Sequence, residues 1–92
     1  ALKPQQNNHK IIRAFFMIQK EKGTVNLQEL EERCSNLEEF PETFVRDFRG
    51  NFAQMKIDAP KSHGKVFEVD NGVVVIWSEV ENILTNYKSY FL

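Results

Sequence analysis

The sequence has little cysteine and no long apolar run, and both shortages exclude classes of protein. Its one cysteine, Cys34, excludes an internal disulfide and a cysteine-based zinc site, so a reducing compartment fits best. The longest uninterrupted apolar stretch, residues 73–77, is far shorter than the roughly 18 residues that a membrane-spanning helix needs. We therefore expect an intracellular protein, cytoplasmic or nuclear, with no membrane partner.

The first ten residues also lack two features, the apolar core of a signal peptide and an initiating Met. This absence suggests a domain cut from a larger protein, with residues 1–7 as a linker remnant. The chain of 92 residues is too short for two cores, and its 8 Phe suggest one core filled by a few large side chains. We expect a single domain over residues 8–92.

A strong charge of one sign is missing as well. The formal net charge is −1, which excludes the global attraction to phosphate of a histone-like protein. The charges are unevenly distributed, however: residues 21–42 hold seven acids and two bases, and residues 43–65 hold five bases and two acids. The sequence therefore predicts a negative side and a positive side.

Apolar residues recur at helical spacing in the first half of the chain and predict three helices, at residues 8–22, 27–35 and 41–51. Asn26 and Glu29 have the spacing of a capping box at the start of the second helix. Pro41 stands where a first-turn proline is tolerated. The predicted core of the third helix includes Phe44, Phe48 and Phe52.

The second half of the chain predicts strands and a last helix. "KVFEV" and "VVVIW" flank Asp70-Asn71-Gly72 and predict an antiparallel hairpin, and residues 54–58 predict a short strand. "VVVIW" has no polar alternation, so we expect it to be covered on both faces by the third helix and the last helix, with Trp77 in the core. Ser78 and Glu81 repeat the capping pattern before a helix at 79–90.

The order of three helices, a hairpin and a helix is that of an α+β winged-helix domain: a helix-turn-helix of three helices, a β-hairpin wing and a C-terminal helix. An α+β domain of unrelated topology stays open. Three segments, "GTVNLQELEERC", "FVRDFRGNF" and "VFEVDNGVVVIW", resemble the LOTUS, or OST-HTH, winged-helix modules of RNA-handling proteins. The resemblance covers about residues 11–77. The chain departs from these modules in two ways. It lacks the tyrosine, proline and glycine pattern that they have between the second and third helices, and "AQMKIDAPKSHGK" is an insertion relative to them.

This resemblance implies RNA binding, or docking of a helicase or another protein. In a helix-turn-helix the third helix faces nucleic acid, and a positive wing beside it contacts phosphates. The expected function is a non-catalytic nucleic-acid-binding module, and the preference for RNA over duplex DNA comes from the resemblance. The candidate contacts are basic residues of the third helix and the following loop: Arg46, Arg49, Lys56, Lys61, His63 and Lys65. The competing interpretation is that these are ordinary solvated charges paired with nearby acids.

An alternative function is protein–protein interaction. The acidic second helix offers Glu31 and Glu32, and the aromatic end of the last helix offers Tyr90 and Phe91, as a partner surface. Homo-oligomerisation stays open. No nucleophile, acid and base occur at a plausible spacing, and His9 and His63 have no metal-ligand spacing. We therefore expect no enzyme activity, no cofactor and no metal, and a buried, inert Cys34.

Overall fold

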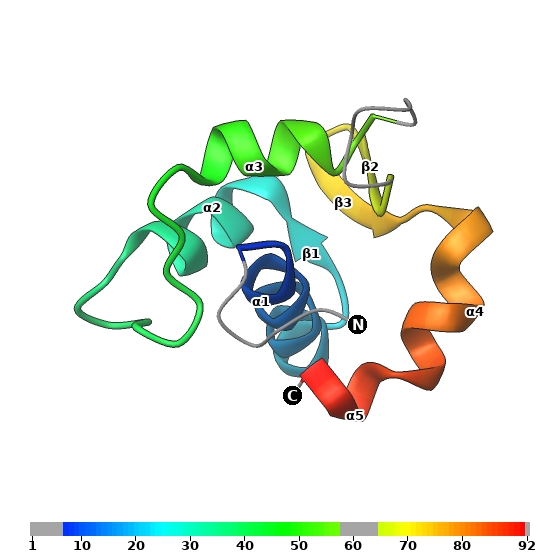
Figure 1. Cartoon of the computed structure of the whole chain (residues 1–92), viewed down its shortest axis with the longest axis horizontal. Helices are drawn as coiled ribbons and strands as arrows, with labels where there is room; N and C mark the ends of the chain where they lie inside the picture. The colour runs from blue at the N-terminus through cyan, green and yellow to red at the C-terminus, as the bar shows by residue number, and fades with distance from the viewer. Residues whose placement is uncertain (1–6, 58–64, 92) are drawn as a thin grey trace.

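A computed structural model describes residues 7–57 and 65–91 of the chain. Within these residues the fold is α+β, with five helices and a three-stranded antiparallel sheet (Figure 1). The elements are α1 (Asn7–Lys22), β1 (Val25–Asn26), α2 (Leu27–Ser35), α3 (Phe48–Gln54), β2 (Phe67–Asp70), β3 (Val73–Ile76), α4 (Ser78–Asn86) and α5 (Lys88–Phe91). None of the helices in the described ranges has the length and apolarity needed to cross a membrane.

Helix α1 is the centre of the core and confirms the helix predicted at 8–22. It starts one residue earlier, so Asn7 belongs to the helix rather than to the predicted linker, whose other six residues lie outside the described ranges. Its buried side chains include Ile11, Phe15 and Ile18, which are spaced for one helical face. In Figure 1, α1 lies in the middle of the molecule, between the layer of α2 and α3 and the short α5.

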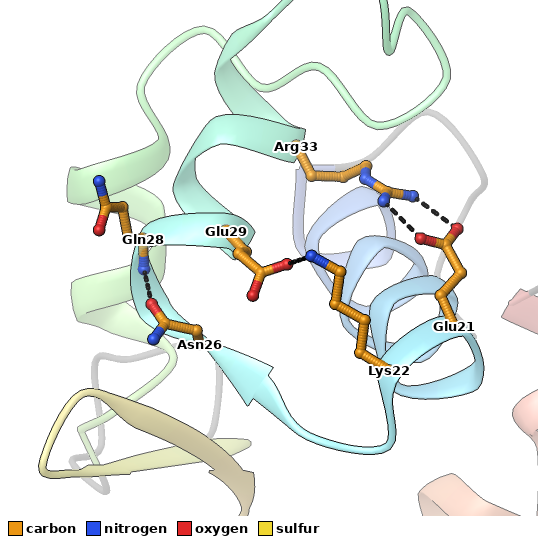
Figure 2. A network of polar contacts seen from close by, with 6 residues as sticks. All are labelled: Glu21, Lys22, Asn26, Gln28, Glu29 and Arg33. Atoms are coloured by element: carbon orange, nitrogen blue, oxygen red, sulfur yellow. Dashed lines mark hydrogen bonds and ion pairs between the residues drawn. The ribbon is translucent and has the colours of Figure 1, made fainter.

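Helix α2 begins where the sequence predicts. The Asn26 side chain caps it, because its Oδ1 accepts a hydrogen bond from Gln28 N at 2.8 Å (Figure 2). The second half of the predicted capping box is different, since Glu29 pairs with Lys22 of α1 (Figure 2). The apolar face is confirmed: Leu30 and Cys34 are both completely buried.

The helix predicted at 41–51 is wrong in position, because α3 is Phe48–Gln54. Residues 43–45 instead close the end of α2: the Thr43 hydroxyl donates to Arg33 O at 2.8 Å, and Val45 N donates to Cys34 O at 2.7 Å. These bonds satisfy carbonyls that lack helical partners, and they prevent a helix from starting at Pro41. Phe48 and Phe52 are buried as predicted, whereas Phe44 is half-buried.

The sheet has the order β1-β3-β2, with β3 in the centre. The predicted hairpin of β2 and β3 is confirmed. Its two-residue turn has positive φ at Asn71 (53°) and Gly72 (80°), the conformation of a tight hairpin turn that Asn-Gly favours. Strand β1, which pairs with Val73 and Val74, was not predicted from the sequence.

Two other strand predictions are wrong. Of the strand predicted at 54–58, residues 54–57 form no strand, because Gln54 ends α3 and Met55 continues into a turn, where its side chain is fully buried, and residue 58 lies outside the described ranges. Strand β3 is covered on one face only: Val74 is 2% exposed, but Val75 is 43% exposed and lies opposite Glu68 of β2. The pleat of β3 therefore alternates between core and solvent although its sequence does not.

The last predicted helix, 79–90, is divided at Tyr87 into α4 and α5. Ser78 is not its cap, since Trp77 occupies that position without a side-chain hydrogen bond, and Trp77 is half-buried rather than in the core. Helix α4 has no buried residue and stands at the edge of the molecule in Figure 1. Helix α5 returns to α1, where Phe91 is buried and its carbonyl accepts from Arg13 Nε at 2.8 Å.

Candidate nucleic-acid interface

Three of the four predicted contacts that the structure describes lie in α3 or in the turns on either side of it, and the fourth, Lys65, precedes β2. Phe48, Phe52 and Met55 are buried, so the opposite side of the helix faces solvent. Arg49, Ala53 and Lys56 follow one another at spacings of four and three residues and are all exposed. Arg46, also exposed, lies in the turn before the helix. The fold thus places Arg46 just before α3, Arg49 in its first turn and Lys56 just after its end.

The start of β2 is fastened to the end of α3. Met55 O accepts hydrogen bonds from Val66 N at 2.7 Å and from Phe67 N at 3.1 Å, and Val66 O accepts from Trp77 N at 2.7 Å. The residues beside these bonds, Lys56 and Lys65, therefore have neighbouring backbones although nine positions separate them in the sequence. The connection also places the ring of Trp77 next to Lys65.

The lysine side chains lie over aromatic rings. Lys65 Nζ is 4.9 Å from the ring centre of Trp77, and Lys56 Nζ is 5.4 Å from the ring centre of Phe52. Both separations allow a cation–π attraction. Basic groups interleaved with aromatic rings are typical of surfaces that hold a nucleic-acid backbone and stack its bases.

The basic residues of this surface differ in whether an acidic side chain already pairs with them. Arg49 Nε is 2.6 Å from Glu31 Oε2, and Lys65 Nζ is 3.1 Å from Glu68 Oε2. The hydrogen bond that Arg49 donates to Glu31, followed by the charge of Glu31, raises the pKa of Arg49, which keeps this side chain protonated. Within residues 7–57 and 65–91, neither Arg46 nor Lys56 has an acidic partner. Lys61 and His63 of the predicted set lie outside the described ranges.

Glu31 is one of several acids in residues 21–42 that are bound internally. Arg33 of α2 holds Glu21 of α1 at 2.9 Å, and Lys22 of α1 holds Glu29 of α2 (Figure 2). The hydrogen bond from Arg33 lowers the pKa of Glu21, against a smaller opposing effect of burial. Part of the acidic side predicted from the sequence is therefore a network that joins two helices rather than a free docking face.

Of the residues predicted to bind a protein partner, the structure exposes some and buries others. Glu32 is exposed and has no basic partner among the described residues, and Tyr90 is 51% exposed. Phe91 is only 5% exposed, because its ring packs 4.8 Å from His9 and 6.1 Å from Phe16 between ring centres. In this structure Phe91 is a core residue, so it offers no surface to a partner.

His9 is a titratable core residue whose position sequence reasoning missed. Its ring is completely buried against Tyr90 and Phe91, with Nε2 3.4 Å from Arg13 Nη2. Its Nδ1 has no hydrogen-bond partner among the described residues. Burial, and then the charge of Arg13, lowers the pKa of His9. Its spacing of three residues before Ile12 and seven before Phe16 was the sequence signal for this buried position.

The described residues hold neither a metal-binding cluster nor a reactive thiol. No cluster of three or more His, Cys, Asp or Glu in residues 7–57 and 65–91 is arranged to hold a metal ion. Burial raises the pKa of the Cys34 thiol to about 12, which suppresses the reactive thiolate. This confirms Cys34 as a buried apolar group.

Comparisons with known proteins add no relative. No family model, curated protein or solved structure matches this chain at a significant level. The functional argument therefore depends on the geometry of the chain itself.

Proposed function

We propose that this chain is a winged-helix module that binds single-stranded nucleic acid, with RNA as the preferred form. The order helix, strand, helix, helix, strand, strand, with β3 between β1 and β2, is compatible with a winged helix. In that arrangement α3 is the element that faces nucleic acid. The preference for RNA comes from the resemblance to LOTUS-type modules.

One observation supports this proposal most: the row of Arg46, Arg49 and Lys56 continues into Lys65 and the half-buried ring of Trp77. Helix α3 has 7 residues and is therefore about 10 Å long. A helix this short makes few contacts in a duplex groove. A single strand can instead follow the basic side chains of Arg46, Arg49 and Lys56. One of its nucleotides can then stack near Trp77.

The proposal is tested by measuring the fluorescence anisotropy of labelled single-stranded and double-stranded RNA and DNA at several salt concentrations. Replacing Lys56 by Gln should weaken binding and reduce the slope of log K against log salt by about 0.7, the value for one lost contact on a single strand. Lys20→Gln is the matched control, because it removes a lysine that is also exposed, near the C-terminal end of α1. Equal slopes for the two variants would refute the proposed interface.

Two further variants test the compensating acids. Glu31→Gln releases Arg49, and Glu68→Gln releases Lys65, so each should tighten nucleic-acid binding. If these basic residues are only solvated charges of the surface, removing their partners leaves binding unchanged. An increase for both variants together with a loss for Lys56→Gln would be hard to explain without a ligand on this face.

A second candidate function, binding of a basic protein segment, is supported by one feature of the loop after α2. Leu37 is 57% exposed and lies in a shallow depression with Glu32 and Glu38. An exposed apolar side chain between acids is a suitable contact for a basic, apolar partner. Glu32→Lys should abolish such binding and leave nucleic-acid binding at Lys56 intact, which separates the two functions.

A further inference from the structure

The sheet has an incomplete edge beside α4. Strand β1 is only two residues long and pairs with Val73 and Val74, while β3 continues to Ile76. Before β1 the chain is still leaving α1, since Gly23 N donates to Gln19 O at 2.8 Å. It reaches the sheet too late to pair with the last residues of β3.

The backbone groups of Ile76 point toward this missing part of β1. Trp77 N donates to Val66 on the β2 side, and Gly72 O accepts from Leu27 N on the β1 side. Backbone groups of successive strand residues point to alternate sides, so Ile76 has the same orientation as Gly72 and Val74. Its N–H and C=O therefore point beyond the end of β1, and no described residue is hydrogen-bonded to them there.

A half-open cleft of about 170 Å³ lies at this position. It is bounded by Phe15 and Gln19 of α1, by residues 23–25, by β3, and by Glu81 of α4. Phe15 and Val25 are each 2% exposed and give the cleft an apolar floor. A volume that would hold about six water molecules also fits one aliphatic side chain.

The charge at the cleft is negative. Glu81 is its only charged lining residue, is itself exposed, and has no ion pair with any described residue. An acidic rim opposes a phosphate backbone and attracts a cation. The same cleft therefore offers an unpaired backbone donor and acceptor, an apolar floor and one carboxylate.

We propose that this cleft binds an extended peptide segment of a partner protein, in which a basic residue stands two positions from an aliphatic residue. The peptide adds to β3 in the place where β1 would continue, and its backbone exchanges hydrogen bonds with Ile76. The residue opposite Ile76 directs its side chain to the same face of the sheet, toward Phe15 and Val25. The basic residue, a lysine or arginine, pairs with Glu81.

The probe is the peptide acetyl-Lys-Thr-Val-Thr-Lys-amide, titrated into the full 92-residue chain and followed by the amide resonances of ¹⁵N-labelled protein. We expect the resonances of Ile76, Gly23 and Thr24 to shift with a dissociation constant of about 1 mM, since one residue pair and one side chain are engaged. The same peptide N-methylated at Val lacks the central donor and should bind about three- to tenfold more weakly.

Glu81→Gln should weaken the peptide about two- to fivefold by removing one surface charge, and Glu79→Gln, its neighbour in the first turn of α4 outside the cleft, should not. The proposal is overturned if the Ile76 resonance does not move at about 5 mM peptide. Equal binding of the N-methylated peptide also overturns it. Shifts at Ile76 that depend on protein concentration without peptide would assign the cleft to a second copy of the chain.

Discussion

The cap of α3 allows a quantitative test of how this displaced helix is held. Asp47 Oδ1 accepts a hydrogen bond from Gly50 N at 3.1 Å, and the Asp47 carboxylate lies directly against the α-carbon of Gly50. A Cβ placed on Gly50 would overlap Asp47 Oδ2 and lie 3.0 Å from its Cγ. The glycine and the cap are therefore coupled: an alanine at position 50 should displace the side chain that starts the helix.

The expected free energies follow from two opposing effects. Gly50→Ala gains up to about 1 kcal/mol of helix propensity but loses the Asp47 cap, worth about 1 kcal/mol, so the unfolding free energy should hardly change. Asp47→Ala should cost about 1 kcal/mol by itself. In the Asp47→Ala background no carboxylate remains to be displaced, and Gly50→Ala should then stabilise by about 1 kcal/mol. The coupling energy of the pair is about 1 kcal/mol.

The assay is urea denaturation of the native chain, both single variants and the double variant, with circular dichroism as the readout. For a domain of this size 1 kcal/mol corresponds to about 4–8 °C in Tm, so a thermal scan provides a second measure. If Gly50→Ala stabilises equally with and without Asp47, the two residues are independent. That result would refute the close approach of Asp47 to Gly50.

Three further predictions concern the core and the hairpin. The pKa of His9 is lowered in the folded chain. The contribution of His9 to stability is therefore complete above the unfolded pKa of 6.5 and decreases as the pH falls below that value. The urea midpoints at about pH 7.5 and pH 5 should differ more for the native chain than for His9→Phe. Cys34 should not react with a thiol reagent until guanidinium unfolds the chain, because the thiol is fully buried; rapid labelling under native conditions would contradict this burial. Gly72→Ala should lower the unfolding free energy by about 1–3 kcal/mol because φ is positive there, whereas Asn71→Gly should have a small effect, as thermal unfolding of both variants would show.

The elements that were predicted from the sequence carry their own local signals. Helix α1 shows helical spacing over 16 residues, α2 has Asn26 as its cap, and the hairpin has Asn-Gly at its turn. Each signal acts within a few residues and needs no distant partner. The extents of α1 and α2 were therefore predicted to within one residue.

The elements that were missed depend on distant partners. Strand β1 has two residues and exists because it pairs with β3, far along the chain. Residues 41–47 have apolar spacing that fits a helix, but the backbone at 43–45 is bound to carbonyls at the end of α2. No local sequence pattern indicates that β1 pairs with β3 or that residues 43–45 bind the end of α2. The position of α3 could therefore not be predicted from the sequence.

The same limitation applies to the charges of the proposed interface. The sequence identified the basic residues, but it could not show that Arg49 faces Glu31, because the pair is separated by 18 residues. Lys65 and Glu68 are only three residues apart and could have been paired in advance. Uncompensated charge is therefore a property of the folded surface, and only Arg46 and Lys56 of the described candidates retain it.

The remaining free charges indicate how a nucleic acid would approach under the proposed function. Three of the seven acids between residues 21 and 42 are held by bases, and the others include Glu38, Glu39 and Glu42 in the loop that leads to α3. Asp47 stands at the start of α3 and Glu31 pairs with Arg49 in its first turn, whereas Lys56 and Lys65 flank the hydrogen bonds that join the end of α3 to β2. Since like charges repel over roughly 8–10 Å at physiological salt, the phosphates should be held mainly where α3 joins β2. Arg46, next to Asp47 in the chain, then contributes less than Lys56 although both are unpaired.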